Sequence, residues 1–411
     1  MISTVSAKYA FRSLLRHRMR TFLSMVGVGI GCAMGVVATS WIRGAVEMEV
    51  RAVAESGTGH LRVVPAKWIE NRENTLRLSD PERTMEIVRQ LPGLKTAAPR
   101  ARTSALLAFG TRTSGVEMMG VDPPAEAASN RTVQKARIYG RYLLPEDSGS
   151  VVIGKTIADR LKVEVGDDLY VTLAGRDEIK SAMLRIVGIL ETGSRDIDEA
   201  ICHVNLPEVG ILTGYEGPGE ITVLLDDYRL VDSAVTELRG RLPAGNTAVS
   251  WQEVNPGWAA GIEGDKAFMS VLIGIVVVVV ALGIASAHVT GVLERRREFA
   301  ILCALGMRGR HLAGLIVLEA ILVGVGGALM AMLLGGSAAY WLSSAGVNFA
   351  AFMGEDVSFG DILLDPYLYG AFGLWVVWYA VGVSVIATLF ASVYPAWLAT
   401  RVNPADALRT V

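Results

Sequence analysis

Four stretches of the chain are apolar and carry no Asp, Glu, Lys or Arg: residues 21–42, 267–293, 320–354 and 366–400. A helix of about 20 apolar residues crosses the ~30 Å hydrocarbon core of a bilayer. Each stretch is therefore predicted to hold one membrane-spanning helix, and the stretch 320–354 must also contain a turn. We expect these helices at 21–43, 266–292, 312–342 and 367–394.

Between the first two apolar stretches, the pattern changes to the short alternating and helical segments of a globular domain. Strands are predicted at 60–65, 96–109, 116–121, 150–153, 169–174, 182–190, 200–205, 220–225 and 247–251. Helices are predicted from Asp80-Pro81-Glu82 to Leu91, at 155–162, after Pro207, at 228–242, and from Pro256 into the second span. This order predicts a large α+β domain at 44–265 with two lobes, of which about 130–217 is inserted into the other.

Both boundaries of this domain read as continuations of the spans. Residues 44–56 have the spacing of a helical extension of the first span, and Gly57 and Gly59 are expected to end it. We therefore expect a four-span membrane protein with its globular domain between spans 1 and 2.

The charges between the apolar stretches predict how the chain crosses the membrane. Residues 1–20 carry five basic side chains and no acid, and residues 293–311 carry five arginines against two glutamates. Basic residues in short loops mark the cytoplasmic side. Residues 44–266 have a net charge of −7, and 343–366 contain four acids with no Lys or Arg. Both termini are expected in the cytoplasm, with 44–265 and the loop 343–366 outside.

Composition adds limits to this interpretation. The chain has 411 residues, is 51% apolar with a mean hydropathy of +0.39, and has a net charge of −2. The first apolar stretch is too long for the core of a cleaved signal peptide, so we expect an uncleaved anchor. Residues 1–20 read either as an amphipathic helix on the inner membrane surface or as the basic flank of that anchor. Three cysteines form no disulfide framework.

Small residues recur at helical spacing in two of the spans. Gly27, Gly31 and Gly35 lie four residues apart in the first span. The third span has the same spacing of small residues at Gly327, Ala331 and Gly335. Such stripes let another helix backbone approach closely. Both are predicted to be helix-packing or dimer-interface surfaces, and the spacing does not identify the partner helix.

One phosphate-binding motif is rejected. Residues 149–156, Gly-Ser-Val-Val-Ile-Gly-Lys-Thr, satisfy the GxxxxGK[ST] pattern of nucleotide-binding loops. The β-branched residues inside the supposed loop, however, are themselves predicted to form the strand. Nucleotide binding is therefore not expected there, and Lys155 is expected to follow a surface strand.

No catalytic or metal-binding pattern is evident. The five histidines are scattered, and HExxH, CxxC and GxSxG motifs are absent from the sequence. Glu319 is the only acid inside a predicted span. Intramembrane carboxylates are functional candidates, but Glu319 lies two to three turns from Arg308 and Arg310. We interpret it as the structural partner of a basic group near the cytoplasmic face rather than as a proton carrier.

The segment 293–311 is the most distinctive part of the sequence. It contains Glu294-Arg-Arg-Arg-Glu-Phe-Ala-Ile-Leu-Cys-Ala-Leu-Gly306, an amphipathic stretch between two spans. This stretch, followed by a helix that carries Glu319-Ala320, resembles the cytoplasmic loop of the MacB/LolC/LolE/FtsX permeases. Those permeases are the membrane subunits of mechanotransmitting ABC transporters. Further resemblances are GHLRV at 59–63, GVDPPAE at 120–126, and the tail at 394–409 with its P-A-x-x-A…P-x-x-A-L-R pattern.

The resemblance implies how such a chain works. It implies a bacterial inner-membrane permease without catalytic residues, whose loop 293–311 docks on a separate ATPase. The residues implied in this coupling are Glu294, Arg295, Arg297, Glu298, Ala304, Leu305, Gly306 and Met307. The implied partners are two ATPase subunits, which bind the ATP and magnesium, and a second permease copy or paralogue. A periplasmic carrier or outer-membrane protein is a further partner, membrane lipid surrounds the spans, and nucleic acid is not a partner.

Three functions remain open on the sequence alone. Chain length and the GHLRV and GVDPPAE segments favour lipoprotein release of the LolC/LolE kind. Residues 174–182, however, lack the proline-rich hook with which those proteins engage their carrier. The loop 294–307 is nearer to MacB, which favours efflux of antibiotics or peptides. An FtsX-like regulator of a cell-wall hydrolase, which transports nothing, is the alternative of another class.

Overall fold

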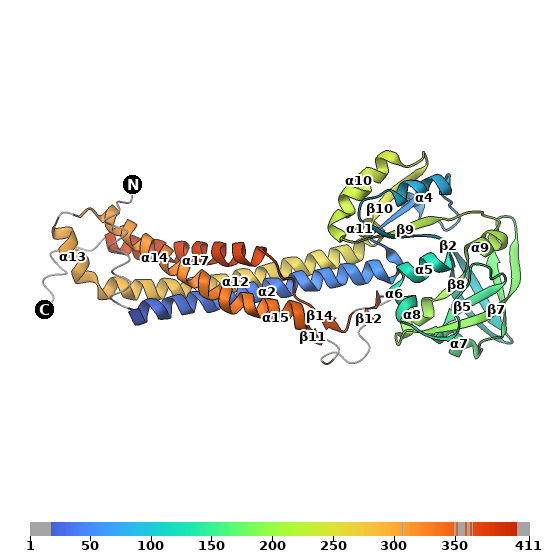
Figure 1. Cartoon of the computed structure of the whole chain (residues 1–411), viewed down its shortest axis with the longest axis horizontal. Helices are drawn as coiled ribbons and strands as arrows, with labels where there is room; N and C mark the ends of the chain where they lie inside the picture. The colour runs from blue at the N-terminus through green and yellow to red at the C-terminus, as the bar shows by residue number, and fades with distance from the viewer. Residues whose placement is uncertain are drawn as a thin grey trace. The chain divides into compact units, whose positions relative to one another are not determined.

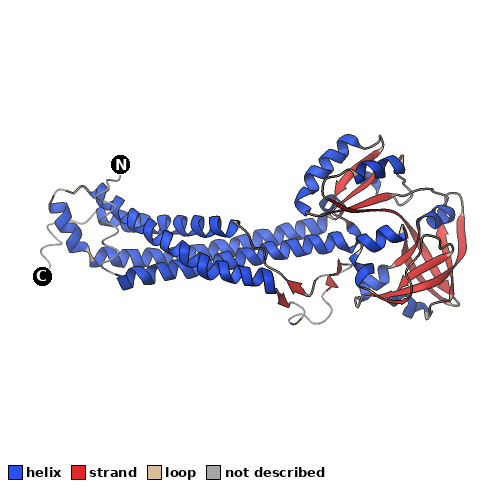
Figure 2. Cartoon of the chain, in the orientation of Figure 1, coloured by secondary structure: helices blue, strands red, loops and turns tan. Residues whose placement is uncertain are grey.

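The structure is a computed structural model in which residues 18–305, 307–348, 351, 358–359, 362–363 and 365–400 are described (Figures 1 and 2). The expected N-terminal helix at 1–20 thus falls almost entirely outside the described residues, as do Gly306 and the tail from residue 401. The chain divides into two compact units. A helical unit takes the described residues up to Val46, Glu263–Val347 and those from Tyr367 on, and an α/β unit takes Glu47–Ile262 and the described part of 348–366.

Four helices of the described chain are long and apolar enough to cross a membrane, as the sequence predicts. They are α2 (Arg18–Val53), α12 (Pro256–Glu294), α14 (Gly309–Ala331), which continues through the π-helical η3 (Met332–Gly336) into α15 (Ser337–Ala345), and α17 (Trp375–Thr400). The short helix α13 (Arg296–Ala304) connects α12 and α14. The four-span fold class is confirmed, with both α2 and α12 extending beyond the membrane-spanning length.

Close packing of α2 on α14 uses one of the two predicted small-residue stripes. A Cβ atom built on Gly335 would lie 2.7 Å from the Cα atom of Ala33, and one on Gly327 would lie 2.4 Å from the Cγ1 atom of Val28. Ala331 is buried on the same face. These contacts require small residues on α14 and η3, because a larger side chain would push the two helix backbones apart.

Two glycines of the predicted stripe on α2 have different surroundings within the chain. Gly27 meets nothing within 4 Å, whereas Gly35 faces the Tyr379 hydroxyl of α17 at 3.4 Å. The residues of α2 that contact α14 or η3 include Met25, Val28, Gly29 and Ala33. A helix that is apolar on every side gives no polar face from which to read its orientation, so the sequence did not show that Val28 and Ala33 contact the third span. The role of Gly27, Gly31 and Gly35 in a dimer interface stays a prediction.

The end of the fourth span also differs from expectation. The sequence placed the end of this helix at Pro395, but α17 continues through Pro395 to Thr400. Proline removes one backbone donor and disfavours a helix interior. Here Ala396 and Ala399 are buried against Leu312 and Ile316 of α14, so packing of the last turn outweighs the local preference.

The α/β unit contains most of the secondary-structure elements. In chain order they are η1 (Ala54–Thr58), β1 (Leu61–Pro65), α3 (Trp68–Asn71), α4 (Pro81–Arg89), β2 (Leu94–Phe109), β3 (Arg112–Val121), α5 (Pro123–Ser129), α6 (Arg131–Lys135), β4 (Arg137–Gly140), β5 (Ser150–Gly154), α7 (Lys155–Leu161), β6 (Asp168–Ala174), β7 (Ile179–Glu191), α8 (Arg195–Ala200), β8 (Cys202–Asn205), α9 (Leu206–Thr213), β9 (Glu220–Leu225), η2 (Tyr228–Leu230), α10 (Val231–Arg241), β10 (Asn246–Ser250) and α11 (Trp251–Val254). The short strands β11 (Val347–Asn348), β12 (Ser358–Phe359), β13 (Ile362–Leu363) and β14 (Tyr367–Leu368) follow later in the chain.

Six strands of this unit close into a barrel. The strands pair in the order β2-β3-β8-β5-β7-β6, and β6 returns to β2. The N-terminal half of β2 pairs instead with β9, and β9 continues through β1 to β10. The unit thus has two lobes that share one long strand, and α4 and α10 belong to the four-stranded lobe (Figure 1).

The inserted lobe is larger than the predicted 130–217. Strands β2 and β3 close the barrel, so the lobe begins within β2 near Ala101 rather than after α5. Sequence periodicity identified both strands but could not show which lobe they join, because pairing between distant strands leaves no local pattern. The barrel interior is filled by fully buried side chains such as Leu107, Met118, Ile153, Leu169 and Leu184.

Candidate functional site

The predicted coupling segment, defined as residues 293–311, contains the expected charged helix between two spans. Helix α12 ends at Glu294, Arg295 leaves helical geometry with φ −96° and ψ 12°, and α13 starts at Arg296. Phe299 and Ala300 are buried, and Phe299 packs in a cluster with Leu312, Ile316, Ala396 and Ala399. The segment is therefore a folded element fixed to α14 and α17.

Arg295 is the residue that fastens α13 to α14. Its Nη1 atom donates to both carboxylate oxygens of Glu319, at 3.1 and 3.2 Å, and its Nε atom donates to Glu298 at 3.2 Å. The guanidinium also lies 5.0 Å from the ring centroid of Phe299, a cation–π geometry. The basic partner of Glu319 is thus Arg295, whereas sequence distance had pointed toward Arg308 and Arg310.

Other predicted coupling residues face away from this anchor. Leu305 is 80% exposed although its spacing from Phe299 and Leu302 suggested a shared apolar face, because α13 ends at Ala304. Glu294, Arg297, Ala304 and Met307 are also exposed, and Gly306 lies outside the described residues. The structure therefore separates the predicted set into an inner pair, Arg295 and Glu298, and an outer group that can meet another protein.

The rejected phosphate-binding motif is a strand and a helix packed into the barrel. Residues Ser150–Gly154 form β5, which pairs with β7 and β8. A Cβ atom on Gly154 would lie 1.9 Å from the carbonyl oxygen of Asp198, so this glycine is required by close packing. Lys155 pairs with Asp159 one turn on, and the motif has no loop that could surround a phosphate.

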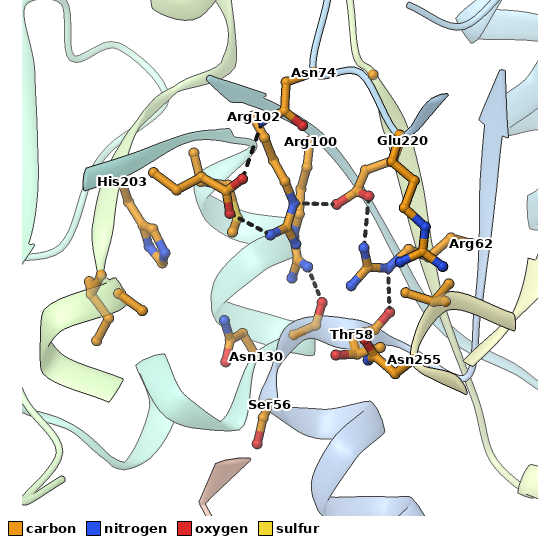
Figure 3. A pocket seen from close by; sticks show the side chains of 18 of the residues that line it. Ser56, Thr58, Arg62, Asn74, Arg100, Arg102, Asn130, His203, Glu220 and Asn255 are labelled. Carbon is orange, nitrogen blue, oxygen red and sulfur yellow. Dashed lines mark hydrogen bonds and ion pairs between the residues drawn. The ribbon is translucent and has the colours of Figure 1, made fainter. Parts of the chain in front are cut away.

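A second candidate site, which sequence reasoning missed, is a cluster of buried charges in the α/β unit (Figure 3). We define the arginine cluster as Arg62, Arg100, Arg102, Glu117, Glu126 and Glu220. The Arg100 guanidinium donates to both Glu126 oxygens, at 2.7 and 2.8 Å. Glu220 accepts from Arg62 at 3.0 Å and from Arg102 at 3.1 Å, and Arg102 also donates to Glu117 at 2.9 Å.

Burial and charge pairing oppose one another in this cluster. Burial disfavours the ionised carboxylate of Glu220, but Arg62, Arg102 and Arg100 outweigh it and lower its pKa to about 2. Burial lowers the pKa of Arg62 to about 10, so Arg62 stays charged at neutral pH. Burial also lowers the pKa of His203, beside the cluster, to about 4. At neutral pH, Glu220 is therefore ionised, Arg62 is charged and His203 is neutral.

The cluster borders a cavity of about 340 Å³, lined by Arg62, Arg100, Arg102, Asn130, His203 and Glu220 among others. The charged side chains of the lining are four arginines and three glutamates, and Glu126 is not among them: Arg62, Arg72, Arg100, Arg102, Glu73, Glu117 and Glu220. The six residues of the arginine cluster come from β1, β2, β3, α5 and β9. Sequence reasoning noted GHLRV and GVDPPAE, which contain Arg62 and Glu126, but the contacts between them depend on strands far apart in the chain.

Comparison with known proteins identifies both parts of the chain. The profile "MacB-like periplasmic core domain" matches residues 21–241, and the profile "FtsX-like permease C-terminal" matches residues 270–404. The lipoprotein-releasing system transmembrane protein LolC of Xylella fastidiosa is 23% identical over 100% of both chains. The macrolide export ATP-binding/permease protein MacB 2 of Aeromonas hydrophila is 24% identical over 98% of this chain and 60% of its own.

A solved structure is also similar to part of the chain. The periplasmic region of MacB from Actinobacillus actinomycetemcomitans matches with a TM-score of 0.36 and 13% sequence identity. The match covers 52% of this chain and 97% of that one.

Proposed function

The chain belongs to the family of permeases that join a MacB-like periplasmic core domain to an FtsX-like C-terminal domain, and we propose that it drives release of lipid-anchored proteins from the membrane. It is a multi-pass ABC transporter permease of the MacB/LolC/FtsX type, and the work of such a permease requires an ATPase partner. The choice of cargo and the roles assigned to individual residues below are our proposal.

The observation that carries the proposal is the extent of the full-length match. The chain and the LolC of Xylella fastidiosa cover one another completely, whereas the chain covers only 60% of the Aeromonas MacB, whose name includes an ATP-binding part. Because the match extends over the whole of that lipoprotein-releasing permease, we infer the same kind of cargo, a protein carrying acyl chains.

An apolar groove in the helical unit supports lipid cargo. It has a volume of about 620 Å³ and lies between α2, α12 and the η3–α15 region of the third span. Its lining comprises Ile30, Ala33, Met34, Gly35, Val37, Ala38, Trp41, Ile42, Met269, Leu272, Ile273, Leu334, Gly335 and Ala338. A groove without charged side chains favours acyl chains, since each buried CH₂ group contributes about 0.8 kcal/mol.

The partners follow from the exposed surfaces of the helical unit. We infer that Arg297, Ala304, Leu305 and Met307 contact the ATPase, because they form the exposed face of a segment anchored by Arg295 and Phe299. Only 6% of the most apolar stretch of α12 is buried within the chain. We therefore infer that α12 faces lipid and a second permease copy, so that two ATPase subunits serve two permeases.

The cargo is tested by reconstituting the native complex, purified with its ATPase, into proteoliposomes. We expect a triacylated lipoprotein to stimulate ATP hydrolysis and to be released, whereas the same polypeptide without acyl chains does neither. Ala38→Trp fills the groove and should abolish the stimulation. Leu333→Trp adds the same side chain at an exposed position outside the groove and should leave it intact.

The outcomes of this test separate the three functions. Stimulation by macrolides or peptides, without a response to the acylated protein, would assign the complex to efflux. A complex that responds to none of these but activates a cell-wall hydrolase would be a regulator. Equal stimulation of the two tryptophan variants by the lipoprotein would remove the groove from the proposal.

A further inference from the structure

The point at which the long helix α2 ends in the α/β unit has an unusual set of contacts. The helix passes into η1, where Gly57 has φ +102°, and Gly59 then has φ +74°. Helical hydrogen bonding cannot continue through these positive φ values, so the last carbonyl groups need other donors. Two of them, those of Gly57 and Thr58, accept hydrogen bonds from arginines of the arginine cluster.

Each of these two arginines comes from a different strand. The Arg100 Nη1 atom, from β2, donates to the Gly57 carbonyl oxygen. The Arg62 Nε atom, from β1, donates to the Thr58 carbonyl oxygen at 2.9 Å. Figure 3 shows both side chains directed at this helix end. The end of α2 is thus held by charge-assisted hydrogen bonds, which are stronger than those between neutral groups.

Carboxylates fix the two arginines in turn. The Glu126 carboxylate of α5 accepts hydrogen bonds from the Nε and Nη2 atoms of Arg100. Asn130 donates to the same carboxylate at 2.8 Å. Glu220 of β9 accepts a hydrogen bond from the Nη1 atom of Arg62 at 3.0 Å. Arg100 and Glu126 are 1% and 0% exposed, so water does not compete for these bonds. The arrangement is rigid because each guanidinium is held from two sides.

We propose that Arg62 and Arg100, backed by Glu220 and Glu126, are positioning residues that transmit movement of α2 to the α/β unit. The inference rests on the proposed function, in which an ATPase moves the spans. A helix end left without donors would fray and absorb a displacement locally. With its last carbonyls fastened to β1 and β2, the same displacement moves both lobes, because β2 is shared between them.

A matched control lies in the same cluster. Arg102 also donates to Glu220, at 3.1 Å, but none of its hydrogen bonds in the described chain goes to η1. Arg62→Met and Arg102→Met each remove one of two arginines from Glu220. Each therefore leaves the glutamate with one cation, which avoids the unpaired buried charge that would unfold the unit.

The first measurement is hydrogen exchange of the full chain in lipid nanodiscs. The Gly59 and His60 amides donate to Ala54 and Val223, at 2.9 Å each, and report on the helix end. We expect Arg62→Met to speed their exchange about tenfold while β3 and β5 amides stay unchanged. Arg102→Met should leave residues 54–60 as in the wild type. Equal exchange of the Gly59 and His60 amides in the two variants would contradict the role proposed for Arg62.

The second measurement uses the complex with its ATPase. We expect ATP with vanadate to change exchange at residues 123–135, which carry Glu126 and Asn130, in the wild type and in Arg102→Met. In Arg62→Met this change should fall at least about fivefold while ATP hydrolysis continues. A change of wild-type size in Arg62→Met would contradict the role proposed for Arg62 and leave the proposed function standing. No change in the wild type, with ATP still hydrolysed, would count against the proposed function itself and against any transmission.

A charge reversal separates holding the fold from transmitting force. Arg100→Glu combined with Glu126→Arg restores an ion pair, but a carboxylate at position 100 cannot donate to the Gly57 carbonyl. We expect the double variant to recover stability relative to Glu126→Ala and still to lose the ATP-dependent change at 123–135. Full recovery of both would overturn the role of the Gly57 contact. Should the double variant not fold, the Arg62 and Arg102 pair decides the matter.

Discussion

The two arginine–glutamate clusters of this protein have the same chemistry in different surroundings. In the coupling segment, Arg295 and Glu319 have side chains that are 13% and 14% exposed, and Glu298 and Arg297 beside them reach solvent. In the α/β unit, Arg100 and Glu126 are shut away from water. The first cluster keeps charges in contact with solvent, whereas the Arg100–Glu126 pair at the centre of the second has none.

The difference teaches what each cluster can do. The Arg295–Glu319 pair should cost less to break, because Arg295 keeps Glu298 as a second carboxylate partner. A buried pair is costly to break, because the remaining charge has no solvent. Surface charges can therefore be changed to affect docking, while the buried cluster must be tested by substitutions that keep its charges balanced.

The largest expected effect comes from breaking the buried pair. Glu126→Ala leaves Arg100 buried without its carboxylate and should destabilise the α/β unit by about 3–5 kcal/mol. Glu319→Ala leaves Arg295 paired with Glu298 and should cost less, about 1.5–3 kcal/mol. Hydrogen exchange of β2 amides for the first, and of α14 amides for the second, gives both values in the full chain. Similar losses at the two sites would erase the contrast.

Acidification should act on the buried cluster next. The pKa of His203 is lowered by burial to about 4, from 6.5 in an unfolded chain. Between these values the unfolded state binds more protons, so stability falls as the pH drops from 6.5 to about 4. The loss is about 3 kcal/mol for one histidine. His60, whose pKa burial also lowers to about 4, adds a similar loss.

His203→Gln checks this origin of the acid sensitivity. The variant should lose the His203 share and keep the His60 share, so its stability should change less between pH 7 and pH 4. Glu220, with a pKa of about 2, affects stability only below its unfolded value of 4.5. An unchanged pH profile in the variant would show that His203 does not titrate in this window.

Two glycines of the spans, Gly335 and Gly27, also differ in how closely they are packed. Gly335→Leu forces a side chain against the backbone of Ala33 and should destabilise α2–α14 packing by about 1–3 kcal/mol. Gly27→Leu meets nothing within 4 Å and should leave the subunit intact. Thermal unfolding in detergent measures the first effect, and crosslinking between copies measures whether Gly27 lies at a second copy. A dimer unaffected by Gly27→Leu would leave this glycine facing lipid.

The smallest effect on stability is expected at the exposed face of the coupling segment. Leu305→Glu should change stability by only about ±0.5 kcal/mol, since the side chain makes no buried contact. It should nevertheless reduce recovery of the ATPase on co-purification, because an apolar contact becomes charged. Thr400→Ala, at another exposed position of the helical unit, is the control. Full ATPase recovery from Leu305→Glu would place docking elsewhere.

Local sequence patterns predicted much of this architecture. The apolar runs predicted four spans, alternation predicted strands such as 96–109 and 169–174, and Asp80-Pro81-Glu82 predicted the start of α4, where Asp80 accepts from the Arg83 amide at 3.2 Å. These features depend on residues that are neighbours in the chain. The charged helix after α12 was predicted for the same reason.

Contacts between distant residues were decided only by the tertiary structure. The sequence could not show that Arg295 pairs with Glu319, that α17 continues through Pro395, or that Gly29 of α2 lies against Gly327 and Met330 of α14. It also could not bring Arg62 and Arg100 to the end of α2. Barrel closure and strand order place those side chains, because the free energy of burying and pairing a charge depends on neighbours that can lie more than 100 residues away in the chain, as Glu220 lies from Arg62.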